Sequence, residues 1–468
     1  MGQYVLIAAA ILRFVCPCGC AWLDPGSVTV SPPSPARQLW AIALPAMLTN
    51  VATALFGLAD MWAIGRLGDA PAQGAVELGA KFMLGLLNVF NFLRTSTVAL
   101  TAQSSGRGDG DAGETLARAM AVALGIGAML LTAMPLAIPL GLDVLGAEGP
   151  VRDAARSYIA VRYWAGPVWL ANCVLVGWLI GRRKVRHVLV IEIIANLAHI
   201  ALDLLLVLVV HWGVAGVATA TVSSEALKFV LLAAIVVREG AARDALAALG
   251  RKGTWARSEL ARLFALNRDL FVRTLLLTGS ILLFARVGAR AGPVTLAANG
   301  VLFQIFMLAT LLLDGFESGA QVLCGEALGA QSRARFTAAV RSALVWGGVT
   351  GLAVAALYAL AGARLAAAFS TDPAVVAATA QYAPWLAVLP VLGVSSFVFD
   401  GVFVGAGWTR AMLGTMAAAM AAYLALLWAL QPLGNHGLWA AFAVLFGGRA
   451  VGQALVLPRL IRRSFSAS

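Results

Sequence analysis

Residues 185–211 read VRHVLVIEIIANLAHIALDLLLVLVVH, and this stretch decides the fold class of the chain. From Leu204 to Val210 every side chain is aliphatic. An α-helix rises about 1.5 Å per residue, so a helix over the whole stretch is longer than the ~30 Å hydrocarbon core of a bilayer. The stretch is therefore typical of a transmembrane helix and too long for an ordinary helix of a soluble core.

Apolar runs of similar length recur along the chain between glycine, proline and charged residues. Of the 468 residues 61% are hydrophobic and 12% are charged, whereas about a quarter of the residues of a soluble domain are charged. We therefore predict an all-α integral membrane protein of about twelve helices. They are predicted at residues 38–64, 75–101, 115–141, 154–181, 185–211, 214–237, 260–289, 295–324, 336–363, 375–404, 410–431 and 436–460.

The net charge of +12 comes from basic residues in alternate short loops between these runs. Loops rich in Lys and Arg stay in the cytoplasm, and an even number of spans then places both termini there. We expect a multi-pass protein of the plasma membrane, in a bacterium the inner membrane. Because the basic residues do not gather on one face, we expect no nucleic-acid partner. The basic loops contain Arg107, Arg118, Arg182, Arg183, Lys184, Arg186, Arg238, Arg243, Arg251, Lys252, Arg257, Arg333, Arg335, Arg410, Arg462 and Arg463.

The two halves of the chain resemble each other. Gln103-Ser104-Ser105-Gly106 aligns with Glu326-Ala327-Leu328-Gly329 at an offset of 326 − 103 = 223, which also pairs Arg118 with Arg341. Because each half has six spans, both halves enter the membrane from the same side, and the repeat is parallel. Transport between two such lobes is the natural use of this architecture, although weak self-similarity also arises by chance in a chain rich in Ala and Leu.

The repeat predicts the domain organisation. We expect a first lobe over residues 37–237, a cytoplasmic linker over 238–258 and a second lobe over 259–460, followed by a basic tail over 461–468. Residues 1–36 contain the sequence Ser31-Pro32-Pro33-Ser34-Pro35, which cannot continue a helix. We interpret residues 1–36 as an extension outside the helical core, either dispensable or the result of an early start codon.

Two carboxylates in the first half are candidate ion-coupling groups. Asp60 and Asp203 lie in apolar runs, where a central ionised carboxylate costs about 2.5–3.5 kcal/mol on insertion scales. His199 precedes Asp203 by four residues, on the same helical face. Desolvation moves a carboxylate towards the range in which it loads and releases a proton. The alternative for all three residues is a satisfied polar contact between helices.

Neutral polar residues and prolines are weaker candidates. Asn172, Asn196 and Thr221 are cavity candidates on neighbouring helices, and hydrogen bonding between helices is the alternative. Pro45 interrupts the first helix and is a candidate hinge, although membrane helices also tolerate proline without functional bending.

The second half has its own charges within the spans, and ion pairing inside the bundle is the simplest explanation for them. Asp269 and Arg273 are one turn apart, so we expect them to pair directly. Arg94 holds the place in the first half that Glu317 holds in the second, since 317 − 94 = 223, and a gate between lobes is the alternative to structural pairing. The charged candidates are Asp269, Arg273, Asp314, Glu317 and Asp400, with Arg268 beside the first of them.

Cys16, Cys18 and Cys20 cluster near the N-terminus, but two-residue spacing without a second ligand pair is weak evidence for a metal site. No nucleophile–base set or phosphate loop is evident, so we predict neither an enzyme, a cofactor nor a metal site.

The residues resemble the multidrug and toxic compound extrusion (MATE) family, and within it the DinF-like branch, over residues 37 to about 460. The most specific segments are Leu266-Asn267-Arg268-Asp269, Arg273-Thr274-Leu275-Leu276, Gly288-Ala289-Arg290, Leu296-Ala297-Ala298-Asn299 and Asp314-Gly315-Phe316-Glu317. Further matching segments are Ala43-Leu44-Pro45, Gly57-Leu58-Ala59-Asp60, Gly177-Trp178, Ala201-Leu202-Asp203, Trp212-Gly213-Val214-Ala215-Gly216, Phe399-Asp400-Gly401-Val402-Phe403 and Leu433-Gly434-Asn435-His436-Gly437.

The resemblance implies two six-helix lobes in a V and alternating access. It also implies export of amphipathic, often cationic, small molecules in exchange for H⁺ or Na⁺. Asp60 is then the leading coupling residue, with Asp203 beside it. The partners expected are the small-molecule substrate and the lipid bilayer, for a chain that acts as a monomer. A lipid-linked precursor flippase and a non-transporting membrane receptor or scaffold are the alternatives.

Two positions depart from the pattern of the family. His199 stands where relatives usually carry Asn, and Glu326 stands where they usually carry Gln. A titratable histidine beside Asp203 leads to the hypothesis that His199 changes the pH range of coupling.

Overall fold

In the computed structural model, every regular element within the described residues is a helix. The structure describes residues 34–65, 69–108, 112–367 and 372–466, without the side chains of residues 54–63, 65, 70, 112, 363, 366 and 367. The predicted extension over residues 1–36 therefore lies almost wholly outside the described residues, and the first described helix begins at Pro35.

The first half contains α2 (Pro35–Gly65), α3 (Ala70–Asn88), η1 (Val89–Asn91), α4 (Phe92–Arg107), α5 (Ala112–Val144), α6 (Gly149–Arg162), α7 (Ala165–Gly181), α8 (Val185–Asp203), η2 (Leu204–Val209) and α9 (Gly213–Arg238). The middle and second half contain α10 (Ala241–Leu249), η3 (Lys252–Trp255), α11 (Arg257–Arg290), α12 (Pro293–Gly329), α13 (Arg333–Ala367), α14 (Pro373–Tyr382), α15 (Pro384–Gly405), α16 (Thr409–Ala429), η4 (Gln431–Leu433) and α17 (Gly434–Phe465).

Ten helices of the described part are long and apolar enough to cross a membrane, and the pair α6 and α7 forms an eleventh candidate. The remaining long helix is α2, with 31 residues, at the position of the first span predicted from the sequence. Several helices extend beyond their predicted bounds because polar residues continue them past the apolar run. At the C-terminal end, α17 continues through Arg462 and Arg463 to Phe465, so most of the predicted tail is helical.

The fourth predicted span of each half is a broken helix. α6 and α7 meet at a bend of 47° around Tyr163 and Trp164, and Pro167 follows in the first turn of α7. In the second half α14 ends at Tyr382 and α15 begins at Pro384. Proline has no N–H to donate, so it is tolerated in the first turn of a helix and favours a break before it.

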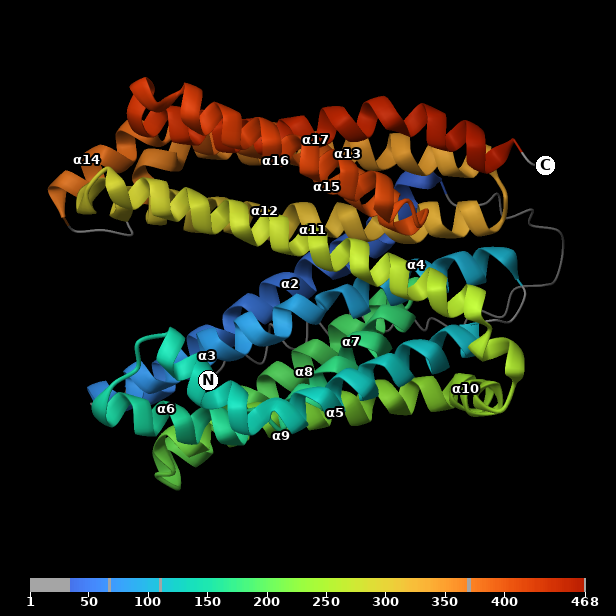
Figure 1. Cartoon of the computed structure of the whole chain (residues 1–468), viewed down its shortest axis with the longest axis horizontal. Coiled ribbons are helices and arrows are strands. Elements are labelled where there is room, and N and C mark those ends of the chain that lie inside the picture. The colour runs from blue at the N-terminus through green and yellow to red at the C-terminus, as the bar shows by residue number, and fades with distance from the viewer. Residues whose placement is uncertain (1–33, 66–68, 109–111, 368–371, 467–468) are drawn as a thin grey trace, which may run out of the picture. The chain divides into compact units, whose positions relative to one another are not determined.

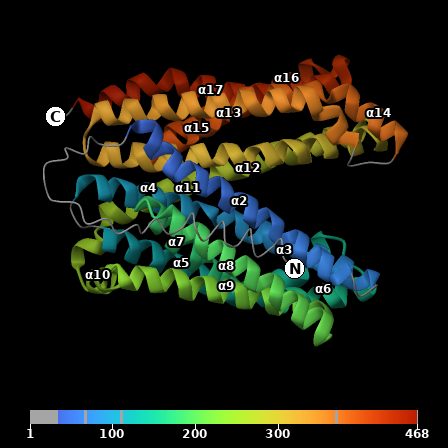
Figure 2. The ribbon, with the colours of Figure 1, turned by 180° about the vertical axis from the view of Figure 1, so that it is seen from behind.

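The helices form two groups that follow the two halves of the sequence. α11 to α17 lie together on one side and α3 to α9 on the other, while α2 packs against both α8 and α12 (Figures 1 and 2). The predicted linker 238–258 is largely ordered, because α10 packs against α5 and η3 leads into α11. Arg118 on α5 fixes this connection by donating to the carbonyl of Thr254 at 2.8 Å and to Glu259 at 3.2 Å.

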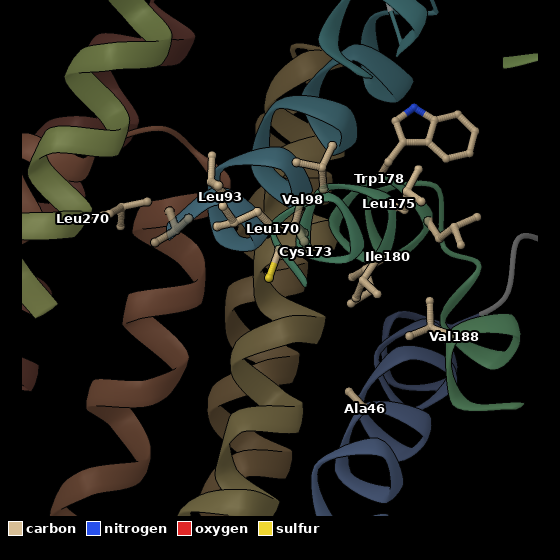
Figure 3. Close-up of a cluster of buried hydrophobic side chains, with 14 of the residues drawn as sticks. Ala46, Leu93, Val98, Leu170, Cys173, Leu175, Trp178, Ile180, Val188 and Leu270 are labelled. Carbon is tan, nitrogen blue, oxygen red and sulfur yellow. The ribbon is translucent and has the colours of Figure 1, made fainter. Parts of the chain in front are cut away.

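The buried core of the first half is centred on α7. Leu170, Trp178 and Ile180 of this helix pack among side chains of α2, α4 and α8, and Leu270 of α11 lies beside this cluster (Figure 3). The same buried cluster continues into α12 and α15, whereas a second cluster is confined to the second half. Burial of apolar side chains therefore joins the two halves as well as filling each of them.

Reciprocal backbone contacts join α4 and α12. A Cβ atom on Gly106 would lie 2.1 Å from the carbonyl oxygen of Glu326, and one on Gly329 would lie 2.0 Å from that of Gln103. Only glycine permits such an approach. Since 329 − 106 and 326 − 103 both equal 223, the two contacts are related by the repeat, as expected for a two-fold axis along the membrane normal.

Candidate functional site

Two cavities of about 510 Å³ each lie within the helical bundle. The first cavity lies mainly in the first half, and the second is bordered mainly by α11, α12 and α17. They share five lining residues, so they meet where α2, α4 and α12 come together. The shared residues are Asn50, Asn88, Asn91, Arg94 and Asp314.

The linings of the two cavities differ in chemistry. Both carry charges of both signs, but the first adds many amide and hydroxyl side chains, whereas the second adds many phenylalanines. The polar and charged residues of the first cavity are Thr49, Asn50, Thr53, Asn88, Asn91, Arg94, Arg162, Asn172, Glu192, Asn196, Thr221, Glu225, Lys228 and Asp314. The phenylalanines of the second cavity are Phe92, Phe303, Phe306, Phe397, Phe442 and Phe446.

His199 and Asp203 form the buried pair expected from their spacing. His199 Nε2 lies 3.2 Å from Asp203 Oδ2, the side chains are 0% and 1% exposed, and Ser224 Oγ lies 3.3 Å from His199 Nδ1. Asp203 is the last residue of α8, after which the chain forms a π-helical segment, a distortion common at functional sites. Neither residue lines either of the two cavities. The side chain of Asp60 lies outside the described residues.

Three of the four neutral candidates border the first cavity. Asn172, Asn196 and Thr221 line it from α7, α8 and α9. Pro45 does not line either cavity. It is buried within α2, which continues past it as one helix, and its carbonyl oxygen accepts from the Thr49 hydroxyl at 2.9 Å.

A charged cluster that was not among the candidates predicted from the sequence lies in the wall of the first cavity. Lys228 Nζ of α9 lies 2.5 Å from Glu192 Oε1 of α8, and Asn172 Nδ2 donates to Glu225 Oε2 at 2.7 Å. The signal was present, because Glu192, Glu225 and Lys228 all stand within apolar helices.

The expected pair between Asp269 and Arg273 is wrong. Arg273 donates instead to Asp400, which is 0% exposed and also accepts from Arg449 and, at 2.8 Å, from Gln453. The two arginines and the amide compensate the charge of this completely buried carboxylate.

Asp269 has other partners, on α11 and α16. It accepts from Arg268 at 2.8 and 3.1 Å and from Thr409 at 3.2 Å. Asp269 and Asp400 are therefore both paired within the second half, and each carboxylate has its own set of partners.

Arg94, Asp314 and Glu317 are half-buried charges at the second cavity. Arg94 and Asp314 border both cavities, whereas Glu317 borders only the second one. A gate made by Arg94 and Glu317 was the alternative drawn from the sequence, and no ion pair joins these two within the described residues.

Side chains close the bundle beside the basic loops. Arg183 of the first half donates from Nε to both carboxylate oxygens of Glu326 in the second half, at 2.6 and 2.9 Å, and also through its Nη2. Gln103 Nε2 donates to the carbonyl of Gly405 at 2.7 Å, and Gln103 Oε1 accepts from Arg262 at 2.5 Å. Glu326 therefore takes part in an ion pair between the two halves.

A duplicated bundle of membrane-spanning helices, with cavities between and within its halves, has the architecture of a secondary transporter. The chain belongs to the MatE family, because the MatE family model matches residues 45–205 and 270–428. The two matched segments begin 270 − 45 = 225 residues apart and end 428 − 205 = 223 apart. They therefore reproduce the internal repeat, and the predicted membership of the MATE transporters is confirmed.

Curated relatives extend the similarity over most of the chain. It is 33% identical over 424 residues to the DNA damage-inducible protein F of Escherichia coli (strain K12), covering 90% of this chain and 92% of that protein. It is 24% identical over 439 residues to the chloroplastic Protein DETOXIFICATION 44 of Arabidopsis thaliana, covering 89% and 81%. With the probable multidrug resistance protein NorM of Caulobacter vibrioides the identity is 27% over 360 residues, covering 73% of each chain.

Solved structures share the fold. A MATE family transporter of the MOP superfamily in an outward-facing conformation matches with a TM-score of 0.81 and 19% identity, over 93% of this chain and 97% of that one. A MOP superfamily transporter from Pyrococcus furiosus, described as having a binding pocket of reverse polarity that suggests a different function, also matches with a TM-score of 0.81. The predicted two-lobed MATE fold is thereby confirmed. The chain is a multi-pass membrane transporter for small molecules, in a family of transporters rather than enzymes.

Proposed function

We propose that the chain is a secondary active antiporter, which exports amphipathic or cationic small molecules in exchange for H⁺ or Na⁺. The observation that carries this proposal is the pair of joined cavities, both of which are lined by charged side chains of both signs, with phenylalanines added in the second. An amphipathic molecule has a polar end for the charged side chains and an apolar body for the phenylalanines, and aromatic faces also attract cations.

The order of residues along α4 and α12 indicates which end of the bundle is closed. On α4 the cavity-lining residues end at Val98, before the contact made by Gly106, and on α12 they end at Gln321, before the contact made by Glu326. The closed end carries the basic loops. If these loops are cytoplasmic, as the positive-inside rule predicts, the cavities face away from the cytoplasm and the structure represents the outward-facing state.

In this proposal Asp60 and Asp203 couple transport to the ion, and His199 adjusts the pH range of Asp203. The contact between His199 and Asp203 supports this role, because the pair is buried beside the first cavity on the helix that carries Asn196. Binding of H⁺ or Na⁺ drives transport only if the ion binds the inward- and outward-facing states with different affinity. We expect rearrangement around this pair to provide that difference.

The mixed charge of the first cavity favours drug-like substrates over the anionic headgroup of a lipid-linked precursor. Arg94, Arg162 and Lys228 are there balanced by Glu192, Glu225 and Asp314. A flippase for such precursors requires a strongly basic cavity to compensate the charge of its phosphates.

The test is efflux of a fluorescent cation from proteoliposomes under an imposed pH or sodium gradient. We expect the Asp60→Asn variant to fold but to lose ion-driven efflux. The matched control is Asp143→Asn, because Asp143 is exposed and pairs with Arg152 at a distance of 2.6 Å, far along the chain from the candidate site. Unchanged efflux by Asp60→Asn, or equal efflux with and without either gradient, contradicts the proposal.

A further inference from the structure

The charged cluster in the first cavity consists of Glu192, Glu225 and Lys228, with Asn172 beside it. Lys228 and Glu225 lie three residues apart on α9 and Glu192 lies opposite on α8. The side chains of Lys228 and Glu192 are only 15% and 10% exposed, although both line the cavity. These charges are thus held at the cavity wall by neighbouring helices, unlike the mobile charges of a solvated surface.

The cluster has more acceptors than donors. With all three groups ionised, two carboxylates face one ammonium, so the cluster carries a net charge of −1. Lys228 bonds to Glu192, while the side-chain hydrogen bond to Glu225 comes from the neutral amide of Asn172. The other amide atom, Asn172 Oδ1, is buried without a hydrogen-bond partner, and Asn172 is 2% exposed. A buried acceptor without a donor is unfavourable, so an N–H group that reaches this oxygen gains a hydrogen bond.

The two arginines of the same cavity do not supply this donor. Arg162 donates to the hydroxyl of Tyr158, and its guanidinium lies 5.5 Å from the centre of that ring. Arg94 lies at the junction of the two cavities, on α4, where it also borders the second cavity with Asp314.

We propose that this cluster is an ammonium-binding subsite, in which Lys228 is the resident cation and a protonated amine of the substrate supplies the second cation that the two carboxylates lack. The incoming N–H groups bond to Glu225 and to Asn172 Oδ1, while Lys228 keeps Glu192. The subsite therefore prefers primary or secondary ammonium ions over quaternary ones, because a quaternary nitrogen has no N–H to donate. Trp169, on the same cavity wall, offers an aromatic face to the body of the ligand. This inference rests on the proposed function only in placing substrate in the first cavity.

The experiment measures binding to the purified full chain in detergent, without any ion gradient. The probes are dansylcadaverine, which carries a primary ammonium, its N-trimethyl derivative and its neutral N-acetyl derivative, followed by the fluorescence of the dansyl group. We expect the parent protein to bind the ammonium probe more tightly than the other two.

Two variants shift this preference in opposite directions. Glu225→Gln weakens binding of the ammonium probe by about tenfold and leaves the acetyl probe unchanged, because one charge-assisted hydrogen bond is lost. Lys228→Met removes the resident cation and strengthens binding of the ammonium probe several-fold, again without effect on the acetyl probe. The controls are Lys184→Met and Glu239→Gln, which break an ion pair at the ends of α8 and α9, outside the cavity.

The proposal is overturned if both variants shift the two probes equally, if both weaken the ammonium probe, or if neither changes any affinity. A thermal melt of each variant identifies misfolded protein, and Lys228→Arg provides a second variant that keeps the charge and is expected to bind like the parent. Selective ammonium binding without gradient-driven efflux supports the subsite and contradicts the antiporter. Gradient-driven efflux without ammonium selectivity supports the antiporter and contradicts the subsite.

Discussion

The ion pair between Arg183 and Glu326 connects the two halves at their closed end, so Glu326→Gln is expected to favour opening there. The glutamine accepts one hydrogen bond from Arg183 through a neutral amide oxygen but loses the negative charge and the two-oxygen contact. Charged hydrogen bonds contribute about 1.5–3 kcal/mol and neutral ones about 0.5–1.5 kcal/mol. The carboxylate is 10% exposed but the side chain of Arg183 is 35% exposed, so solvent screens part of the interaction. We therefore expect the closed state to lose about 1–1.5 kcal/mol, a shift of roughly 5- to 12-fold in the equilibrium.

The assay is the distance distribution between spin labels, measured by double electron–electron resonance with labels at residues Arg186 and Arg333. Both residues are exposed, and they stand at the starts of α8 and α13, one in each half. The native cysteines are replaced by alanine. Glu326→Gln should increase the long-distance population by the stated factor. The control Glu239→Gln breaks a pair inside the first half and should leave the distribution unchanged. An unchanged distribution in Glu326→Gln, or a shift towards short distances, refutes the reasoning.

Four further predictions concern other contacts. Asp400→Asn leaves two buried arginines without a carboxylate, so the melting temperature should fall by the equivalent of about 3–5 kcal/mol, and an unchanged melt contradicts the buried network. A Cβ on Gly401 would lie 2.2 Å from a backbone carbonyl of α12, so Gly401→Ala should cost at least about 1–3 kcal/mol of stability. Gly414→Ala, with nothing within 4 Å, should melt like the parent. The pH profile of transport should differ between His199→Asn and the parent, and identical profiles exclude a role for this histidine in coupling. The hydrogen bond from Lys184 lowers the pKa of Glu239. This contact therefore stabilises the fold above the ordinary glutamate range, and the stabilisation is lost as the pH falls through the lowered pKa. The acid dependence of the melting temperature should be weaker in Glu239→Gln.

The fold could be predicted largely from the sequence, because length and apolarity identify spanning helices. The repeat at an offset of 223 also aligned Gly106 with Gly329, the two glycines that make the reciprocal contacts between α4 and α12. The spacing of four residues likewise predicted the pair of His199 with Asp203.

Contacts between different helices were less accessible from the sequence. Local spacing suggested Asp269 as the partner of Arg273, but a completely buried carboxylate 127 residues away takes that guanidinium. Lys228 and Glu192 are visible as charges in apolar runs, yet their pairing depends on how α8 and α9 are rotated about their axes. Periodicity within one helix does not determine that rotation relative to a neighbour.

The reciprocal contacts of Gly106 and Gly329 also bear on how such a chain arose and can be assembled. An interface in which each half offers the same glycine and the same carbonyl is self-complementary, like the interface of a symmetric homodimer. A single ancestral half could therefore have paired with a second copy of itself before the two were fused. The present connection through α10 then serves to keep two partners at high local concentration, and two co-expressed halves divided within that connection should still find each other in the membrane.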